Sequence, residues 1–202
     1  MSALRPTVAG MTDLWQHWDA PREPPMAGDE AASLIGSLER QRLTLAYKCG
    51  DLDAEAMRVS IGASTLTLGG LLKHLALVED HHWRVKFLGR ELSEPWDAVD
   101  FAADPEWEFR TAADDSPDEL FALWLAAVDR SRAIVADALV EGGLDTPAQF
   151  AWPDNRTPSL RRLLLDLLEE YARHVGHADL IRESIDGRVG EDAPWNHDEE
   201  VG

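Results

Sequence analysis

Residues 159–187, SLRRLLLDLLEEYARHVGHADLIRESIDG, decide the fold of this chain. When this stretch is placed on a helical wheel, at about 100° per residue, its large apolar side chains fall on one stripe. The stripe consists of Leu160, Leu163, Leu164, Leu167, Leu168, Tyr171, Ala178, Ile181 and Ile185. Upstream, Thr157 is a candidate N-cap with Pro158 at the first helical position, and Gly187 is a typical terminator. The pattern predicts one long amphipathic helix that ends near Asp186.

Three further segments have helical spacing and comparable length. The first covers residues 29–48 and stops before Gly50, and the second covers residues 67–89. The third opens at residue 116 with the letters SPDE, a capping box with proline at the first helical position. A short helical turn is predicted around residues 53–57, and no convincing strand pair is found.

These helices predict the fold class: all-α, a four-helix bundle with a long crossover connection and short flexible tails. The crossover, residues 90–115, is acidic and carries two tryptophans, and connections of this length are often functional lids. We expect an N-terminal extension (1–26), the bundle (27–191) and an acidic C-terminal tail (192–202).

The composition favours an intracellular protein that binds neither nucleic acid nor a membrane. The chain carries 38 acidic and 19 basic residues, a formal charge of −19, so binding to nucleic acid or to an anionic membrane surface is unfavourable. The sequence lacks both an apolar run of about 18 residues and the pattern of a signal peptide. Its single cysteine, Cys49, has no partner for an internal disulfide. We therefore expect a cytoplasmic protein.

Polar side chains interrupt the apolar stripe of the last helix. His174 falls inside the stripe, Glu170 and His177 fall on its edge, and spacings of three and four residues place all three on one face. The second helix has a histidine of the same kind, His74, within LLKHLALVE. Together His74, Glu170 and His174 could hold zinc or nickel while leaving positions open for water or substrate.

A simpler interpretation competes with the metal site on equal terms. Histidines on apolar helix faces are often packing residues with one hydrogen bond, and these side chains alone do not decide between the two. Glu79 is likewise open to two interpretations, as an acceptor that orients His74 or as a solvated charge.

The motifs resemble those of a known superfamily. The stretches GDEAASLIGSLERQRLTLAYKCGDLD (28–53), LTLGGLLKHLALVE (66–79) and EEYARHVGHADLIRE (169–183) resemble the DinB-like (DinB/YfiT) superfamily. Within it they resemble the actinobacterial mini-circle-protein branch, whose function is unassigned. The pair Glu170 and His174 is also similar to the Glu-x-x-x-His pattern in the metal-binding domain of mycothiol-dependent maleylpyruvate isomerase. The resemblance covers residues 27–191.

This resemblance implies a four-helix bundle with a divalent metal, held by one histidine of the second helix and two groups of the fourth. Carried over residue by residue, the ligands are His74, Glu170 and His174. Many members have a histidine where this chain has Glu170. His177 is then a catalytic acid–base group at the rim, or a substitute ligand.

The resemblance further implies an enzyme that uses a low-molecular-weight thiol, such as mycothiol, for S-transfer or isomerisation. The thiol would come from a cosubstrate, because Cys49 lies away from the predicted ligands. Trp96 and Trp107 of the crossover would cover the site or only pack against the bundle. A homodimer is compatible with the resemblance. The alternatives are a non-catalytic bundle that binds a metal or small molecule, a structural protein, and a metal-dependent hydrolase.

Overall fold

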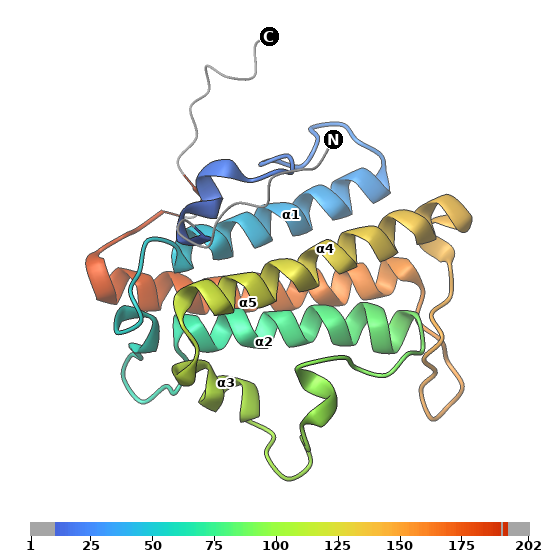
Figure 1. The fold of residues 1–202 in the computed structure, drawn as a ribbon. Coiled ribbons are helices and arrows are strands. Elements are labelled where there is room, and N and C mark those ends of the chain that lie inside the picture. The colour runs from blue at the N-terminus through green and yellow to red at the C-terminus, as the bar shows by residue number, and fades with distance from the viewer. Residues whose placement is uncertain (1–10, 191, 194–202) are drawn as a thin grey trace, which may run out of the picture.

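The computed structural model describes residues 11–190, 192 and 193, and its main feature is a bundle of four long helices (Figure 1). They are α1 (Glu30–Cys49), α2 (Leu68–Asp80), α4 (Pro117–Glu141) and α5 (Leu160–Asp186). α2 continues without a break into one wide, π-helical segment, η3 (His81–Phe87). α1 packs mainly on α5, and α2 mainly on α4. This architecture confirms the predicted all-α bundle. None of the described helices has the length and apolarity needed to cross a membrane.

The helix ends largely follow the capping signals in the sequence. Asp29 caps α1 by accepting a hydrogen bond from the backbone N–H of Ala32 at 2.8 Å, and Ser116 forms the predicted capping box. The predicted start of α5 at Thr157 is wrong. The N-cap is Ser159, because the preceding residues are extended: the Pro158 carbonyl accepts the Ala148 N–H at 2.9 Å.

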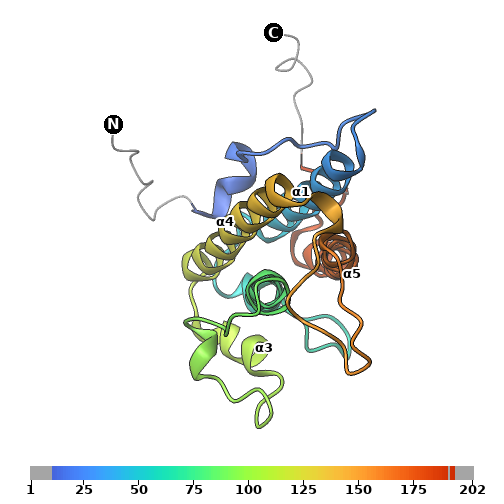
Figure 2. The same cartoon turned by 90° about the vertical axis from the view of Figure 1, so that its right-hand side faces the viewer.

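The connections carry short helical turns of their own. The turn predicted near residues 53–57 is η2 (Ala56–Arg58), and a single turn, η6 (Gly143–Asp145), follows α4. The crossover contains η4 (Trp96–Ala98), α3 (Trp107–Thr111) and η5 (Ala112–Asp114). In the end-on view of Figure 2, this crossover and the connection before α5 both lie on the side of α2 and α5 that faces away from α1.

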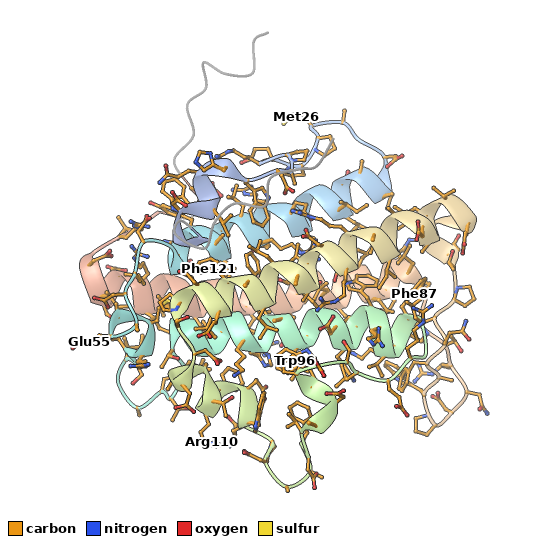
Figure 3. The ribbon with its side chains drawn as sticks, viewed as in Figure 1. Met26, Glu55, Phe87, Trp96, Arg110 and Phe121 are labelled. Carbon is orange, nitrogen blue, oxygen red and sulfur yellow. The ribbon has the colours of Figure 1, made fainter. Side chains whose placement is uncertain are left out.

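The apolar core lies where the four long helices meet (Figure 3). The segment before α1 adds to it: the 3-10 turn η1 (Met11–His17) contacts α1 and α4, and Trp18 stacks on Trp124 with ring centroids 5.9 Å apart. Of the tails that the sequence predicts, residues 1–10, 191 and 194–202 lie outside the described residues, whereas Asp192 accepts two hydrogen bonds from Arg40 and Ala193 is buried.

A buried polar network crosses this core, and Glu79 is its centre. The carboxylate is fully buried and accepts hydrogen bonds from Arg42 of α1 (2.8 Å, twice), Ser131 of α4 (2.6 Å) and Tyr171 of α5 (2.7 Å). Both interpretations of Glu79 from the sequence are therefore wrong. It neither orients His74 nor lies in solvent; instead it joins all four long helices.

Candidate metal centre

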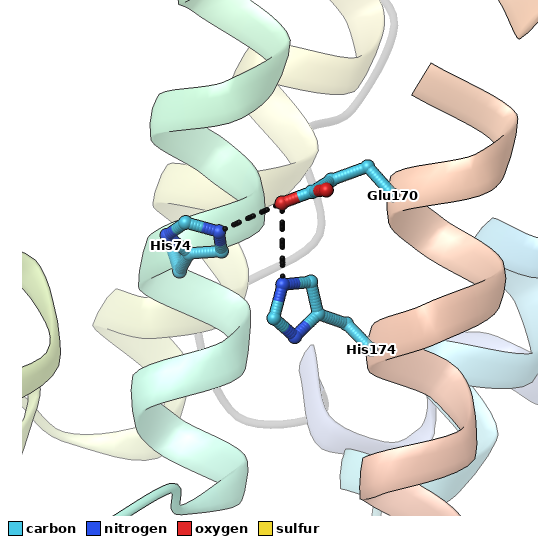
Figure 4. A group of neighbouring side chains, drawn as sticks. All are labelled: His74, Glu170 and His174. Carbon is cyan, nitrogen blue, oxygen red and sulfur yellow. Dashed lines mark hydrogen bonds and ion pairs between the residues drawn. The ribbon is translucent and has the colours of Figure 1, made fainter. Parts of the chain in front are cut away.

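Three side chains from α2 and α5 converge midway along these helices (Figure 4). Oε1 of Glu170 lies 3.2 Å from Nε2 of His74 and 3.2 Å from Nε2 of His174. One potential ligand atom from each residue lies within 4.8 Å of the others. The residues that the sequence singled out as ligands are thus brought together in space.

The donor set and its spacing suit a divalent transition metal. Two imidazole nitrogens and one carboxylate oxygen are typical ligands of zinc and nickel. Ligands about 2.0–2.1 Å from a tetrahedral zinc lie about 3.3–3.4 Å from each other, close to the separations from Glu170. His174 is only 9% exposed, so the three-residue group is buried on the side that faces the bundle. Three protein ligands would leave at least one coordination position for another molecule.

The same contacts shift the pKa values of Glu170 and His74. Hydrogen bonds from His174 and His74 hold the pKa of Glu170 well below its usual range. Burial disfavours the charged imidazole of His74, but hydrogen bonds to Glu108 and Glu170 outweigh it and raise the pKa of His74. The carboxylate of Glu170 is therefore ionised at neutral pH, as a metal ligand must be.

The crossover supplies an unpredicted partner for His74. Oε1 of Glu108, in α3, lies 3.0 Å from Nδ1 of His74, and the Phe109 ring stacks on the imidazole at 4.6 Å. Glu108 is buried, and its other oxygen, Oε2, has no hydrogen-bond partner among the described residues. Sequence reasoning missed Glu108 because it is one of several acidic residues in the crossover, and only the fold distinguishes it.

His177 lies beside the three residues but is not one of the group. Its Nδ1 is 3.4 Å from Nδ1 of His174, the nitrogen that points away from Glu170. Partial desolvation and the neighbouring charges of His174 and Arg173 lower the pKa of His177. The imidazole is therefore neutral at pH 7 and able to accept a proton.

The thiol of Cys49 cannot take part in a reaction at the candidate metal centre. Cys49 is fully buried where α1 ends, with Sγ facing the Leu68 carbonyl, and burial raises the pKa of its thiol to about 12.

The two crossover tryptophans contact each other, with Trp96 and Trp107 edge to face at 6.1 Å. Neither of them stacks on a candidate ligand among the described ring contacts, whereas the phenyl ring of Phe109 stacks on His74.

The comparisons with known proteins agree with this architecture. A family model described as mycothiol-S-transferase matches residues 33–187, which include most of α1, all of the other three long helices and the three converging side chains. Comparison with curated proteins gives no match. The match confirms the resemblance to the DinB-like superfamily, whereas the mini-circle-protein branch stays a prediction. The chain belongs to the mycothiol-S-transferase family, a DinB-like family.

Proposed function

We propose that this protein is a divalent-metal-dependent enzyme that uses a low-molecular-weight thiol, with mycothiol as the leading cosubstrate. The thiol would serve for S-transfer to a substrate or for isomerisation of a substrate. The observation that carries the proposal is the convergence of His74, Glu170 and His174, with two nitrogens and one oxygen facing one point. The family description supports the thiol class. Zinc or nickel bound there would lower the pKa of a thiol and make it nucleophilic at neutral pH.

The chain's own residues would hold and orient the reactants. His74 and His174 each present Nε2 toward Glu170, and Nδ1 of His74 has the carboxylate of Glu108 as its partner. Such partners fix the imidazole tautomer and ring orientation. Because Cys49 is buried and protonated, the sulfur that reacts must arrive on a cosubstrate.

In an S-transfer, the cosubstrate sulfur forms a bond to an electrophilic carbon while the bond from that carbon to its leaving group breaks. The thiol proton must pass to a base. We assign this role to His177, because it is neutral at pH 7 and adjoins the ligand cluster. In an isomerisation, the same sulfur adds to one carbon of a double bond in the substrate, which leaves a single bond that can rotate. The sulfur then leaves again and the double bond re-forms.

The deciding experiment measures both the metal content of the protein and its turnover of a thiol. Protein purified without a histidine tag should contain about one equivalent of zinc or nickel, as for a single site. It should also conjugate mycothiol to a small electrophile such as monochlorobimane. Both properties should be lost in His74→Ala and in His174→Ala. His17→Ala is the matched control, because His17 is exposed in η1.

Two results would reject the proposal. The first is wild-type protein that stays metal-free after incubation with excess zinc. The second is metal-loaded protein that hydrolyses esters or amides but accelerates no thiol reaction, which would favour the hydrolase alternative.

A further inference from the structure

A cavity of about 240 Å³ lies between α4 and the segment that runs from the end of α2 through η3. None of the three candidate ligands lines it. Asp80 of its wall follows His74 by six residues, about 240° around the helix, so the two side chains leave α2 on different faces. The volume is somewhat below that of sites for drug-sized ligands, which favours a smaller molecule.

The two carboxylates that line the cavity already have counter-charges of their own. Glu79 is paired with Arg42, and Asp80 accepts two hydrogen bonds from the guanidinium of Arg130, at 3.0 and 2.8 Å. Both carboxylates are buried, so these pairs are held in place by the packing around them. Neither carboxylate is therefore left to balance a further positive charge in the cavity.

Two further guanidinium groups line the cavity, those of Arg84 and Arg90. Nε of Arg84 donates to the backbone carbonyl of Glu91, which carries no charge. Arg90 also lines a larger hollow together with Glu91 and Asp97, but no ion pair joins either carboxylate to it within the described part of the chain. The cavity therefore has two positive charges in surplus, in a chain whose formal charge is −19.

Apolar side chains form much of the remaining wall. Trp83 is almost fully buried and is fixed by a 3.3 Å hydrogen bond from its indole N–H to Glu79, and Leu88 and Ile134 pack against the core. A guanidinium can donate two parallel hydrogen bonds to a planar carboxylate. Guanidinium groups beside apolar walls therefore suit a carboxylate that is attached to an apolar body, whereas inorganic phosphate would leave the apolar walls without a partner.

We propose that this cavity is a second ligand site, which binds a small carboxylate with an apolar body. Arg84 and Arg90 bind the carboxylate group, and the body lies against Trp83 and Ile134. The inference does not rest on the proposed function, because neither His177 nor any candidate metal ligand lines the cavity.

The test titrates the full-length protein with benzoate and follows the indole N–H resonance of Trp83 by NMR. Benzoate should shift this resonance with a Kd of about 0.1–1 mM, since so small a ligand reaches only modest affinity. Benzyl alcohol, which lacks the carboxylate, and inorganic phosphate, which lacks the apolar body, should each bind at least about tenfold more weakly. The double variant Arg84→Ala/Arg90→Ala should weaken benzoate binding at least about tenfold, a loss of about 1.4 kcal/mol. Arg58→Ala removes an exposed positive charge at η2 and is the matched control.

A second variant tests the cavity without changing its charge. Ala133 lines the cavity from an exposed position of α4, so Ala133→Phe fills the space while the core and both arginines stay intact. Benzoate binding should again fall at least about tenfold in this variant.

Several results would overturn the inference. Unchanged benzoate affinity in the double variant or in Ala133→Phe would show that the cavity is not the site. Equal binding of benzyl alcohol would show that the guanidinium groups are not used, and equal binding of phosphate that the apolar walls are not. If binding is lost in His174→Ala but kept in the double variant, the carboxylate binds at the candidate metal centre; that result rejects the second site and leaves the proposed function standing.

Discussion

Oε1 of Glu108 lies 3.0 Å from Nδ1 of His74, which joins the crossover to the middle of α2. A neutral imidazole that donates from Nδ1 has only Nε2 left as a metal ligand, and Nε2 is the atom that faces Glu170. The contact therefore selects the tautomer that a metal centre at this position requires.

Glu108→Ala should reduce zinc affinity about 10–100-fold, the usual effect of removing such a partner. Glu108→Gln should retain most of the affinity, because the amide oxygen can accept the same hydrogen bond. Competition with a chromophoric chelator measures both variants. Glu106→Ala, an exposed residue two positions earlier, should match wild type. Equal affinity in Glu108→Ala and wild type would show that the contact does not support the metal.

His177→Ala should keep its metal and lose activity. The side chain contacts His174 rather than the point on which the three candidate ligands converge, so elemental analysis should find metal near the wild-type level. Thiol turnover should fall about 10²–10⁴-fold if His177 accepts the thiol proton. Loss of metal in this variant would instead make His177 a ligand and leave the role of Glu170 in doubt.

Glu79→Ala should lower the free energy of unfolding by about 3–5 kcal/mol, because it leaves the guanidinium of Arg42 buried without its main counter-charge. Urea unfolding monitored by circular dichroism, in the presence of a chelator, gives the value. Glu169→Ala, exposed on α5, should change stability by less than about 0.5 kcal/mol. Similar curves for the two variants would mean that the network contributes little.

His82 should make the metal-free protein less stable in acid. Burial, helped by the charge of Lys86, lowers the pKa of His82 to about 4, whereas an unfolded histidine takes up its proton near pH 6.5. The unfolded state therefore binds more protons between these values, and stability falls as pH falls through this window. Urea unfolding at pH 7.5 and 4.5 should show a smaller decrease in His82→Gln than in wild type or in His17→Gln. Parallel decreases in all three would rule out His82 as the source.

Cys49 should resist alkylation in the folded protein. With its pKa raised to about 12 by burial, the thiol stays protonated at pH 8.5, whereas the thiol of an unfolded chain is about half ionised there. Iodoacetamide should modify Cys49 rapidly in guanidinium and hardly at all in native buffer, as mass spectrometry would show. Rapid native labelling would place a reactive thiol inside the protein and weaken the argument for a cosubstrate thiol.

Periodicity and capping predict most of this fold because they are local signals. The spacing of apolar residues is sufficient to place α5, and the capping box is sufficient to start α4 at Pro117. The shift of the α5 cap from Thr157 to Ser159 has a non-local cause, the pairing of Pro147 with Ser159 in a bridge. No propensity within the segment itself encodes that pairing.

The candidate ligands could be predicted because two of them share one helix and the third interrupts an apolar run. Their partners could not, since Glu108 reaches His74 only after the crossover has folded back on α2. Arg182 illustrates the same limit. Its charge within the last helix suggests a surface residue, yet it is fully buried and donates to the carbonyls of Lys48 and Gly50 at the end of α1. Such groups meet through topology, which composition and spacing do not specify.

All three candidate ligands stand on the long helices, whereas a separate cavity lined by Trp96, Asp97 and Gln149 takes most of its walls from the crossover and the connection before α5. Apart from Glu108, the residues of the candidate metal centre therefore belong to other segments of the chain than most residues of this cavity. Connections tolerate insertion and replacement far better than packed helices do. Descendants of one ancestor could thus reshape this cavity by exchanging the connection before α5 and the part of the crossover that precedes α3, and a protein engineer could do the same while Glu108 and the three candidate ligands are kept.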